Sequence, residues 1–238
     1  MARLRLGVWL NELGAGAEFL GALLTGVDRS LPRGDGSGVL LVPGLWGGDS
    51  SLFILRHALE ELGYDARTWG LGLNNRCGEE SVVKLIDVAR RMRAGHRRPL
   101  AVIGHSRGGF IARELARRAP ELADLVITLG TPIGGTSLRD ESLAIRGLLA
   151  ASRALYSRQP GCMSEKCDCE YVRLLRTPRN SGAALYSLWS RGDGVVAPEN
   201  CMLAGEPNIE VPGSHVGMVA NRTVLSVIAR TLARHRRS

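Results

Sequence analysis

One serine stands between glycines in the segment GHSRGG, which runs from Gly104 to Gly109. Four apolar residues precede this segment, and a helical pattern follows it. A sharp turn between a strand and a helix exposes the hydroxyl of such a serine, and flanking glycines let the turn pack closely. Ser106 therefore has the setting of a nucleophile. The structural alternative is a glycine-rich turn that binds phosphate at a helix N-terminus.

A serine nucleophile needs a general base, and the base needs a carboxylate to orient it. Asp193 follows the apolar run ALYSLW in a Gly-Asp-Gly turn, and His215 follows the run IEV. Serine, acid and histidine in this order, each beyond a strand, form the triad of one type of parallel-sheet enzyme. We therefore predict a catalytic triad of Ser106, Asp193 and His215. A turn residue and a buried structural histidine are the alternatives for the last two.

The other histidines and acids fit this arrangement less well. His105 adjoins the serine, but we expect its side chain to point away from Ser106 on a tight turn. The remaining histidines and the fallback acids lie at less suitable places: His57, His96, His235, Asp124, Asp168 and Glu199.

Acyl transfer also needs hydrogen-bond donors for the developing oxyanion. The amide that follows the nucleophile belongs to Arg107, and the loop LVPGLWGGDSS offers the amide of Leu45. A plain glycine loop is the alternative for that segment. The neighbouring Trp46 either lines a substrate pocket or packs beneath a cap.

Apolar runs that alternate with helical patterns must position these residues. The expected strands are Val39–Gly44, 64–72, Leu100–Gly104, Leu122–Pro132, Ala183–Ser190 and a segment from Asn208. The expected helices are Leu52–Gly63, Ser81–Gly95 with Ser81 as N-cap, Gly109–Pro120, a helix around Leu143–Leu155, and Arg222–Arg234. This alternation predicts an α/β fold with a mostly parallel sheet and helices on both faces.

The chain is long enough for one core, so we expect one domain at 31–238 and an N-terminal helical extension at 1–30. The long interval without a strand predicts a small cap insertion at about 133–182, over the carboxyl edge of the sheet. The N-terminal segment is too interrupted, by Asn11 and Glu12, to span a bilayer. It packs on the domain or pairs two chains, and a peripheral membrane anchor is the alternative.

The formal net charge is +8, and lysine occurs only at Lys84 and Lys166. The arginines are scattered over predicted helices without interleaved aromatic residues, which argues against nucleic-acid binding. We expect a cytoplasmic protein, with membrane association as an alternative. The five cysteines include no C-x-x-C pair. They are ordinary thiols or, in an exported protein, a cap disulfide, with Cys201 as one partner of Cys162, Cys167 or Cys169.

The motifs LVPGLWGGDSS, GHSRGG, ITLGTPIGGT, YSLWSRGDGVV and IEVPGSHVGM occur in the order found in the α/β-hydrolase superfamily. The chain resembles its lipase and esterase branch, and in particular a bacterial group with a GWGLG-like segment, matched here by Thr68–Asn75. The resemblance covers Val39 to Ala233. It implies an α/β-hydrolase fold and a serine hydrolase that uses the triad and oxyanion amides named above. It implies no metal or organic cofactor.

Two positions depart from the pattern. Many lipases have His-Gly where this chain has Pro43-Gly44, and Arg107 occupies a position often held by an apolar residue or glutamine. The arginine leaves an acidic or polar substrate open. We expect hydrolysis of a small acyl ester or lipid through an acyl-enzyme. The alternatives are an acyltransferase or thioesterase with the same triad, and a non-catalytic lipid-binding or scaffold protein.

Overall fold

The structure is a computed structural model that describes Glu12 and residues 14–134, 143–156, 167, 169–175 and 182–237. Its sheet has the order β2-β1-β3-β4-β5-β6, and every neighbouring pair is parallel. The strands are β1 (Gly38–Val42), β2 (Asp65–Thr68), β3 (Leu100–His105), β4 (Ala123–Leu129), β5 (Ala184–Trp189) and β6 (Asn208–Glu210). The predicted α/β architecture with a parallel sheet is confirmed.

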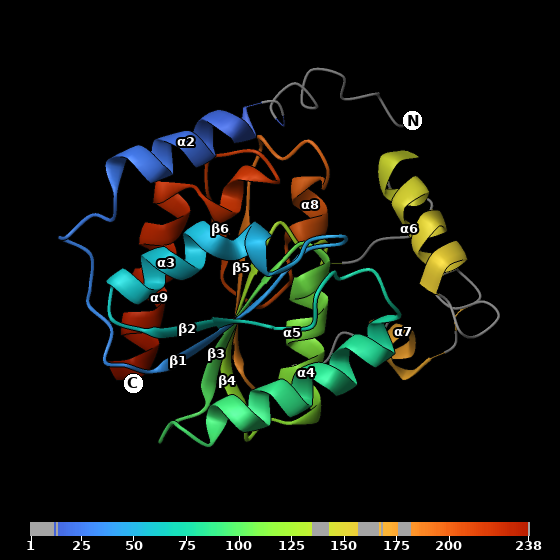
Figure 1. Ribbon diagram of the computed structural model, residues 1–238, viewed down its shortest axis with the longest axis horizontal. Helices are drawn as coiled ribbons and strands as arrows, with labels where there is room; N and C mark the ends of the chain where they lie inside the picture. Colours follow the sequence, from blue (N-terminus) through green and yellow to red (C-terminus); the bar gives the residue numbers. More distant parts are fainter. Residues whose placement is uncertain are drawn as a thin grey trace.

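Helices cover both faces of this sheet (Figure 1). One face carries α2 (Ala15–Thr25), α3 (Phe53–Glu61) and α9 (Arg222–Arg237), and the other carries α4 (Gly78–Arg93) and α5 (Arg107–Arg118). Shorter or inserted elements are η1 (Asp49–Leu52), α6 (Leu143–Tyr156), α7 (Glu170–Leu175), α8 (Pro198–Cys201) and η2 (Gly217–Val219). None of the helices described is long and apolar enough to cross a membrane.

Alternate residues of the central strands supply the two cores. In β1, Val39 and Leu41 pack on the α3 and α9 face, whereas Leu40 and Val42 pack on the α4 and α5 face. Side chains of successive strand residues point to opposite faces, so a strand buried on both sides reads as a continuous apolar run. This is why the sequence signals the central strands so clearly.

The order of the strands reverses between β1 and β3, because β2 lies on one side of β1 and the later strands on the other. Loops at the carboxyl ends of two such strands diverge and leave a crevice, which is where open α/β sheets bind ligands. The loop of Leu45 follows β1, and the turn of Ser106 follows β3. The fold therefore brings these two predicted segments to the same switch point.

Helix α4 begins earlier than the sequence predicts. It starts at Gly78 with Cys77 as N-cap, so the prediction of Ser81 as N-cap is wrong. Two acidic residues, Glu79 and Glu80, occupy the first turn, where the helix dipole favours negative charge. The buried Ser81 instead lies inside the helix, and its amide donates to the Cys77 carbonyl.

The insertion and the extension have described helices within their predicted limits. Helices α6 and α7 lie within the predicted cap at 133–182, and α2 lies within 1–30. Helix α2 packs on the domain through Phe19. The division into domain, extension and cap stays a prediction.

Candidate active site

Ser106 lies at a strained turn between β3 and α5. Its backbone has φ 51° and ψ −124°, a conformation that residues other than glycine rarely adopt. Three hydrogen bonds hold this turn: the Ser106 amide donates to Leu129 O at 2.8 Å, and the Ser106 carbonyl accepts from Thr131 Oγ1 and the Gly109 amide. Strain of this kind persists only where the surroundings enforce it, and it gathers at functional sites.

The glycines around Ser106 are required for packing, as the sequence predicts. A Cβ on Gly104 would collide with the backbone of Gly109, and one on Gly108 would collide with the carbonyl of Val42. A Cβ on Gly109 would strike the side chain of Thr131. The helix that begins at the serine therefore lies directly against the neighbouring strands.

Asp193 and His215 come together on the loops after β5 and β6. The Nδ1 of His215 lies 2.7 Å from Oδ2 of Asp193, and both residues are buried. The other carboxylate oxygen, Oδ1, accepts hydrogen bonds from the amides of Val195 and Val196 at 2.8 and 2.7 Å. A carboxylate fixed by two amides in this way is oriented to accept the Nδ1 proton, which leaves Nε2 of the imidazole as the basic nitrogen.

Gly130, at the end of β4, lies beneath this pair. A Cβ there would be 3.0 Å from both Oδ2 of Asp193 and Nδ1 of His215. The pair therefore lies at the carboxyl end of β4, which is the strand paired with β3, and β3 carries the serine turn.

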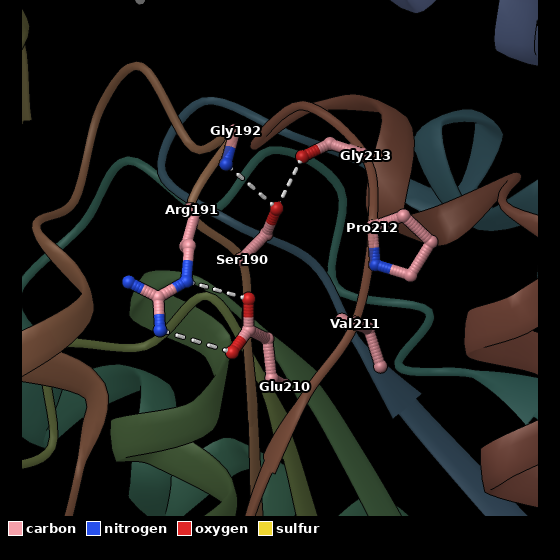
Figure 2. Close-up of a pocket in the computed structure, with 7 residues that line it drawn as sticks. All are labelled: Ser190, Arg191, Gly192, Glu210, Val211, Pro212 and Gly213. Atoms are coloured by element: carbon pink, nitrogen blue, oxygen red, sulfur yellow. Dashed lines mark hydrogen bonds and ion pairs between the residues drawn. The ribbon is translucent and has the colours of Figure 1, made fainter.

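Ser190 joins the two loops that carry the acid and the histidine (Figure 2). Its hydroxyl donates to the Gly213 carbonyl at 2.6 Å and accepts from the Gly192 amide at 3.0 Å. Beside it, the exposed pair Arg191 and Glu210 bridges the same two segments at the pocket drawn in Figure 2. The loops are therefore fastened to each other as well as to the sheet.

His105 contacts the backbone of His215. Its Nε2 lies 2.9 Å from the carbonyl oxygen of His215, and the two rings are 4.9 Å apart. A carbonyl only accepts, so Nε2 of His105 carries the proton. Burial of the ring, with a smaller repulsion from His215, lowers the pKa of His105 to about 3. This neutral imidazole is a contact between the serine turn and the histidine loop that the sequence did not reveal.

Asn74 joins the loop after β1 to the serine turn. It is fully buried, and its Nδ2 donates to the Pro43 carbonyl at 2.7 Å. Its backbone pairs with the same loop, donating to Gly47 O and accepting from the Trp46 amide. The Arg107 guanidinium donates to both oxygens of Asn74 and to the Arg76 carbonyl. The arginine side chain is thus engaged with the protein, which argues against its use as a binding group for an acidic substrate.

The predicted oxyanion donors lie on either side of this junction. Among the described residues, no backbone carbonyl accepts the Leu45 amide. Arg107 is the first residue of α5, and the first four amides of a helix have no partner within it. Trp46, which follows Leu45 in the loop after β1, has φ +59°, a strained conformation for an aromatic residue. Its predicted contact with substrate stays a prediction.

The comparisons with known proteins agree with this architecture. The model of the alpha/beta hydrolase family matches residues 39–231. This chain belongs to that family. No curated protein matches it.

Solved structures share the fold of this hydrolase family member at low sequence identity. The mature lipase BlEst2 of Bacillus licheniformis is 18% identical with a TM-score of 0.62, and the match covers 87% of this chain and 94% of the lipase. The metagenomic carboxyl esterase MGS0156 is 16% identical with a TM-score of 0.62, covering 90% and 80%. Lipase B of Aspergillus fumigatus is 16% identical with a TM-score of 0.61, covering 87% and 55%. These likenesses show the fold.

No disulfide joins the cysteines that the structure of this hydrolase family member describes. Cys77, Cys167, Cys169 and Cys201 are thiols, and Cys162 lies outside the described residues. Cys201 is buried beside Trp189 and Val196, and this burial raises the pKa of its thiol. In the same described part of the chain, no group of three or more His, Cys, Asp or Glu side chains is placed to hold a metal ion.

One of the fallback acids lies away from the histidine loop, and another lies outside the described residues. Asp124, at the start of β4, pairs with Arg236 and His235 at the amino edge of the sheet. Asp168 lies outside the described residues.

Two glutamates outside the predicted triad, Glu12 and Glu18, contact the loop that carries His215. The only sequence signal for them is that charged residues interrupt an otherwise apolar N-terminal segment.

Proposed function

We propose that this protein is a serine hydrolase that cleaves carboxylic acyl esters through an acyl-enzyme. The observation that carries the proposal is the 2.7 Å hydrogen bond between His215 and Asp193. These two residues lie on loops near the strained turn of Ser106. A phosphate-binding turn requires neither this pair nor its position. The hydrogen bond supports the proposed roles of Ser106 as nucleophile, His215 as base and Asp193 as orienting acid.

In the proposed reaction, Nε2 of His215 removes the hydroxyl proton of Ser106 as the serine oxygen bonds to the ester carbonyl carbon. Asp193 accepts the Nδ1 proton and stabilises the imidazolium. The bond to the alkoxy group then breaks, and the departing alcohol takes the proton from His215. Water, activated by the same imidazole, attacks the acyl-enzyme, and the carboxylic acid leaves as Ser106 regains its proton.

The amides of Leu45 and Arg107 are the proposed donors for the oxyanion of each tetrahedral intermediate. Asn74 and the Arg107 guanidinium support them by joining the two segments that carry these amides. The proposed substrate is a moderately apolar acyl ester, because the sequence of the inserted segment is rich in leucine, alanine and isoleucine. Trp46 is the proposed contact for the acyl group.

The test is hydrolysis of p-nitrophenyl esters from acetate to palmitate by wild type and by Ser106→Ala, with Ser30→Ala as control. Ser30 is an exposed serine in the loop before β1. We expect the loss of Ser106 to lower kcat by about a millionfold and the control to match wild type. A Ser106→Ala variant that retains hydrolysis would refute the serine mechanism.

A second measurement separates hydrolysis from acyl transfer. Adding an alcohol or a thiol to the reaction and measuring the partition of acyl groups between it and water shows which acceptor the acyl-enzyme prefers. Hydrolysis as the main reaction predicts free acid as the principal product. Transfer to most of the added acceptor at low concentration would favour an acyltransferase.

A further inference from the structure

The carboxylate of Glu12 binds three backbone amides of the two loops that carry the proposed acid and base. Its Oε1 accepts from the Gly194 amide at 3.0 Å and from the His215 amide at 2.7 Å. Its Oε2 accepts from the Val216 amide at 3.0 Å. One side chain therefore spans the residue after Asp193 and the backbone of His215 itself.

A second glutamate of the same segment reinforces this contact. Glu18, in α2, accepts from Ser214 Oγ at 3.0 Å and from Asn221 Nδ2 at 3.3 Å. Two glycines of the histidine loop leave room for its carboxylate, because a Cβ on Gly213 would lie 2.8 Å from Oε1 and one on Gly217 would overlap Oε2. The loop sequence is thus shaped to receive the N-terminal helix (α2 crosses this end of the molecule in Figure 1).

These contacts fall where the sheet itself gives the least support. The strand before His215, β6, has three residues and lies at the edge of the sheet, paired only with β5 among the described strands. The loop that carries His215 follows this short strand. The position of the loop therefore depends on contacts other than the hydrogen bonds between β5 and β6. Charge-assisted hydrogen bonds from a carboxylate to amides are stronger than neutral ones and fix their donors closely.

We propose that Glu12 is a positioning residue for the base of the reaction: its carboxylate fixes the His215 loop against the Asp193 turn so that the imidazole keeps its bond to Asp193. This inference rests on the proposed function. Glu12 contacts only backbone amides in the described structure, so it acts through His215 and not on the substrate. On this basis, the N-terminal segment helps to position the base of the proposed active site.

The variants Glu12→Ala and Glu12→Gln of the 238-residue chain test this assignment, with Glu121→Ala as the matched control. Glu121 is exposed at the opposite, amino edge of the sheet. Three quantities are measured for each protein: kcat and KM on the best p-nitrophenyl ester, the downfield proton resonance of His215 Nδ1, and the midpoint of thermal unfolding. A His215→Ala protein assigns the resonance.

We expect Glu12→Ala to lower kcat by about tenfold to a hundredfold, because small displacements of a catalytic group are costly, and to leave KM within about twofold of wild type. The Nδ1 resonance broadens or disappears. Glu12→Gln retains an oxygen for two of the amides but sets its NH2 against a third donor, so its kcat lies between those of wild type and Glu12→Ala. Glu121→Ala matches wild type in all three quantities.

Two results would overturn the inference. One is a Glu12→Ala protein with wild-type kcat and an intact Nδ1 resonance. The other is a loss of activity that merely follows a lower unfolding midpoint while the resonance persists, since this would show a purely structural role. A wild type that hydrolyses no ester would refute the proposed function separately, and the resonance of wild type and Glu12→Ala would still decide the positioning role.

Discussion

The base side and the oxyanion side of the candidate site are held in place by different kinds of groups. On the base side, Asp193 and His215 lie on the loops after β5 and the edge strand β6, and a carboxylate from the N-terminal segment binds the backbone of both loops. On the oxyanion side, the fully buried Asn74 and the guanidinium of Arg107 join the loop after β1 to the serine turn. The first arrangement depends on the N-terminal segment, and the second depends on side chains in the interior.

This difference predicts different costs. Removing a buried amide leaves its partners without hydrogen bonds in the interior, which lowers the free energy of unfolding directly. Loops that follow a short edge strand generally open at a lower free energy than the core, so we expect loss of their contacts to change local geometry more than global stability. Substitutions on the oxyanion side should therefore lower stability and activity together, whereas those on the base side should lower mainly activity.

The largest effect that sharpens this comparison is expected for Asp193→Asn. The asparagine oxygen still accepts from Val195 and Val196, so the protein folds with nearly unchanged stability. Its NH2 group opposes the Nδ1 proton of His215 and favours the wrong tautomer, so kcat should fall by about ten-thousandfold. Steady-state kinetics and urea unfolding measure the two quantities.

Asp124→Asn is the matched control for that variant, because Asp124 pairs with Arg236 at the far edge of the sheet. Its kcat should equal that of wild type. A decrease of less than about tenfold in Asp193→Asn would remove Asp193 from the proposed triad.

A smaller effect, but one on both quantities, is expected for Asn74→Ala. The substitution deprives the Pro43 carbonyl and the Arg107 guanidinium of a buried partner, so the free energy of unfolding should fall by about 2 kcal/mol. The loop of Leu45 keeps its backbone bonds to residue 74 but loses the side-chain bonds that link Pro43 and Arg107 to that residue, so kcat falls as well. Urea unfolding and ester kinetics on the same preparation test the pairing of the two losses.

Asn75→Ala is the control, because its buried side chain makes no hydrogen bond within the described part of the structure. We expect it to lower the free energy of unfolding by less than about 1 kcal/mol. If both asparagine variants destabilised the protein equally, or if Asn74→Ala kept wild-type kcat, the two sides of the site would not differ in the way proposed.

The sequence predicted what depends on local pattern. The apolar runs before Ser106 and Asp193 located two central strands, and glycines near each turn marked where the strands end. Since parallel strands place their carboxyl ends at one edge, the chain order alone predicted that Asp193 and His215 would meet, and the structure places them in hydrogen-bond contact. Helix boundaries were less predictable, as the early start of α4 shows.

What depends on long-range contacts could not be predicted. Nothing near Arg107 in the sequence indicates that its guanidinium binds Asn74, which lies on a different loop. Glu12 interrupts an apolar segment, and that pattern argued only against a membrane span. Its contact with the His215 amide joins residues 203 positions apart, and only the packing of α2 creates it. In both cases the missing information was the path of the chain between the partners.

An effect on the pH dependence of stability, with little change in kcat, is expected for His105, which contacts the base side through the His215 carbonyl and adjoins the loop after β1 near Gly44. Its pKa falls from 6.5 to about 3 on folding because the ring is desolvated, so between these pH values the unfolded chain binds a proton that the native protein does not. Stability from this group is complete above pH 6.5 and is lost as the pH decreases toward 3. The slope of the free energy of unfolding against pH is at most about 1.4 kcal/mol per pH unit.

His105→Gln cannot titrate, so its free energy of unfolding, measured in urea from pH 7 to 4.5, should fall less steeply than that of wild type. His57→Gln, on the exposed face of α3, should follow the wild-type curve. Parallel curves for His105→Gln and wild type would mean that the imidazole is not kept neutral between the two sides of the site.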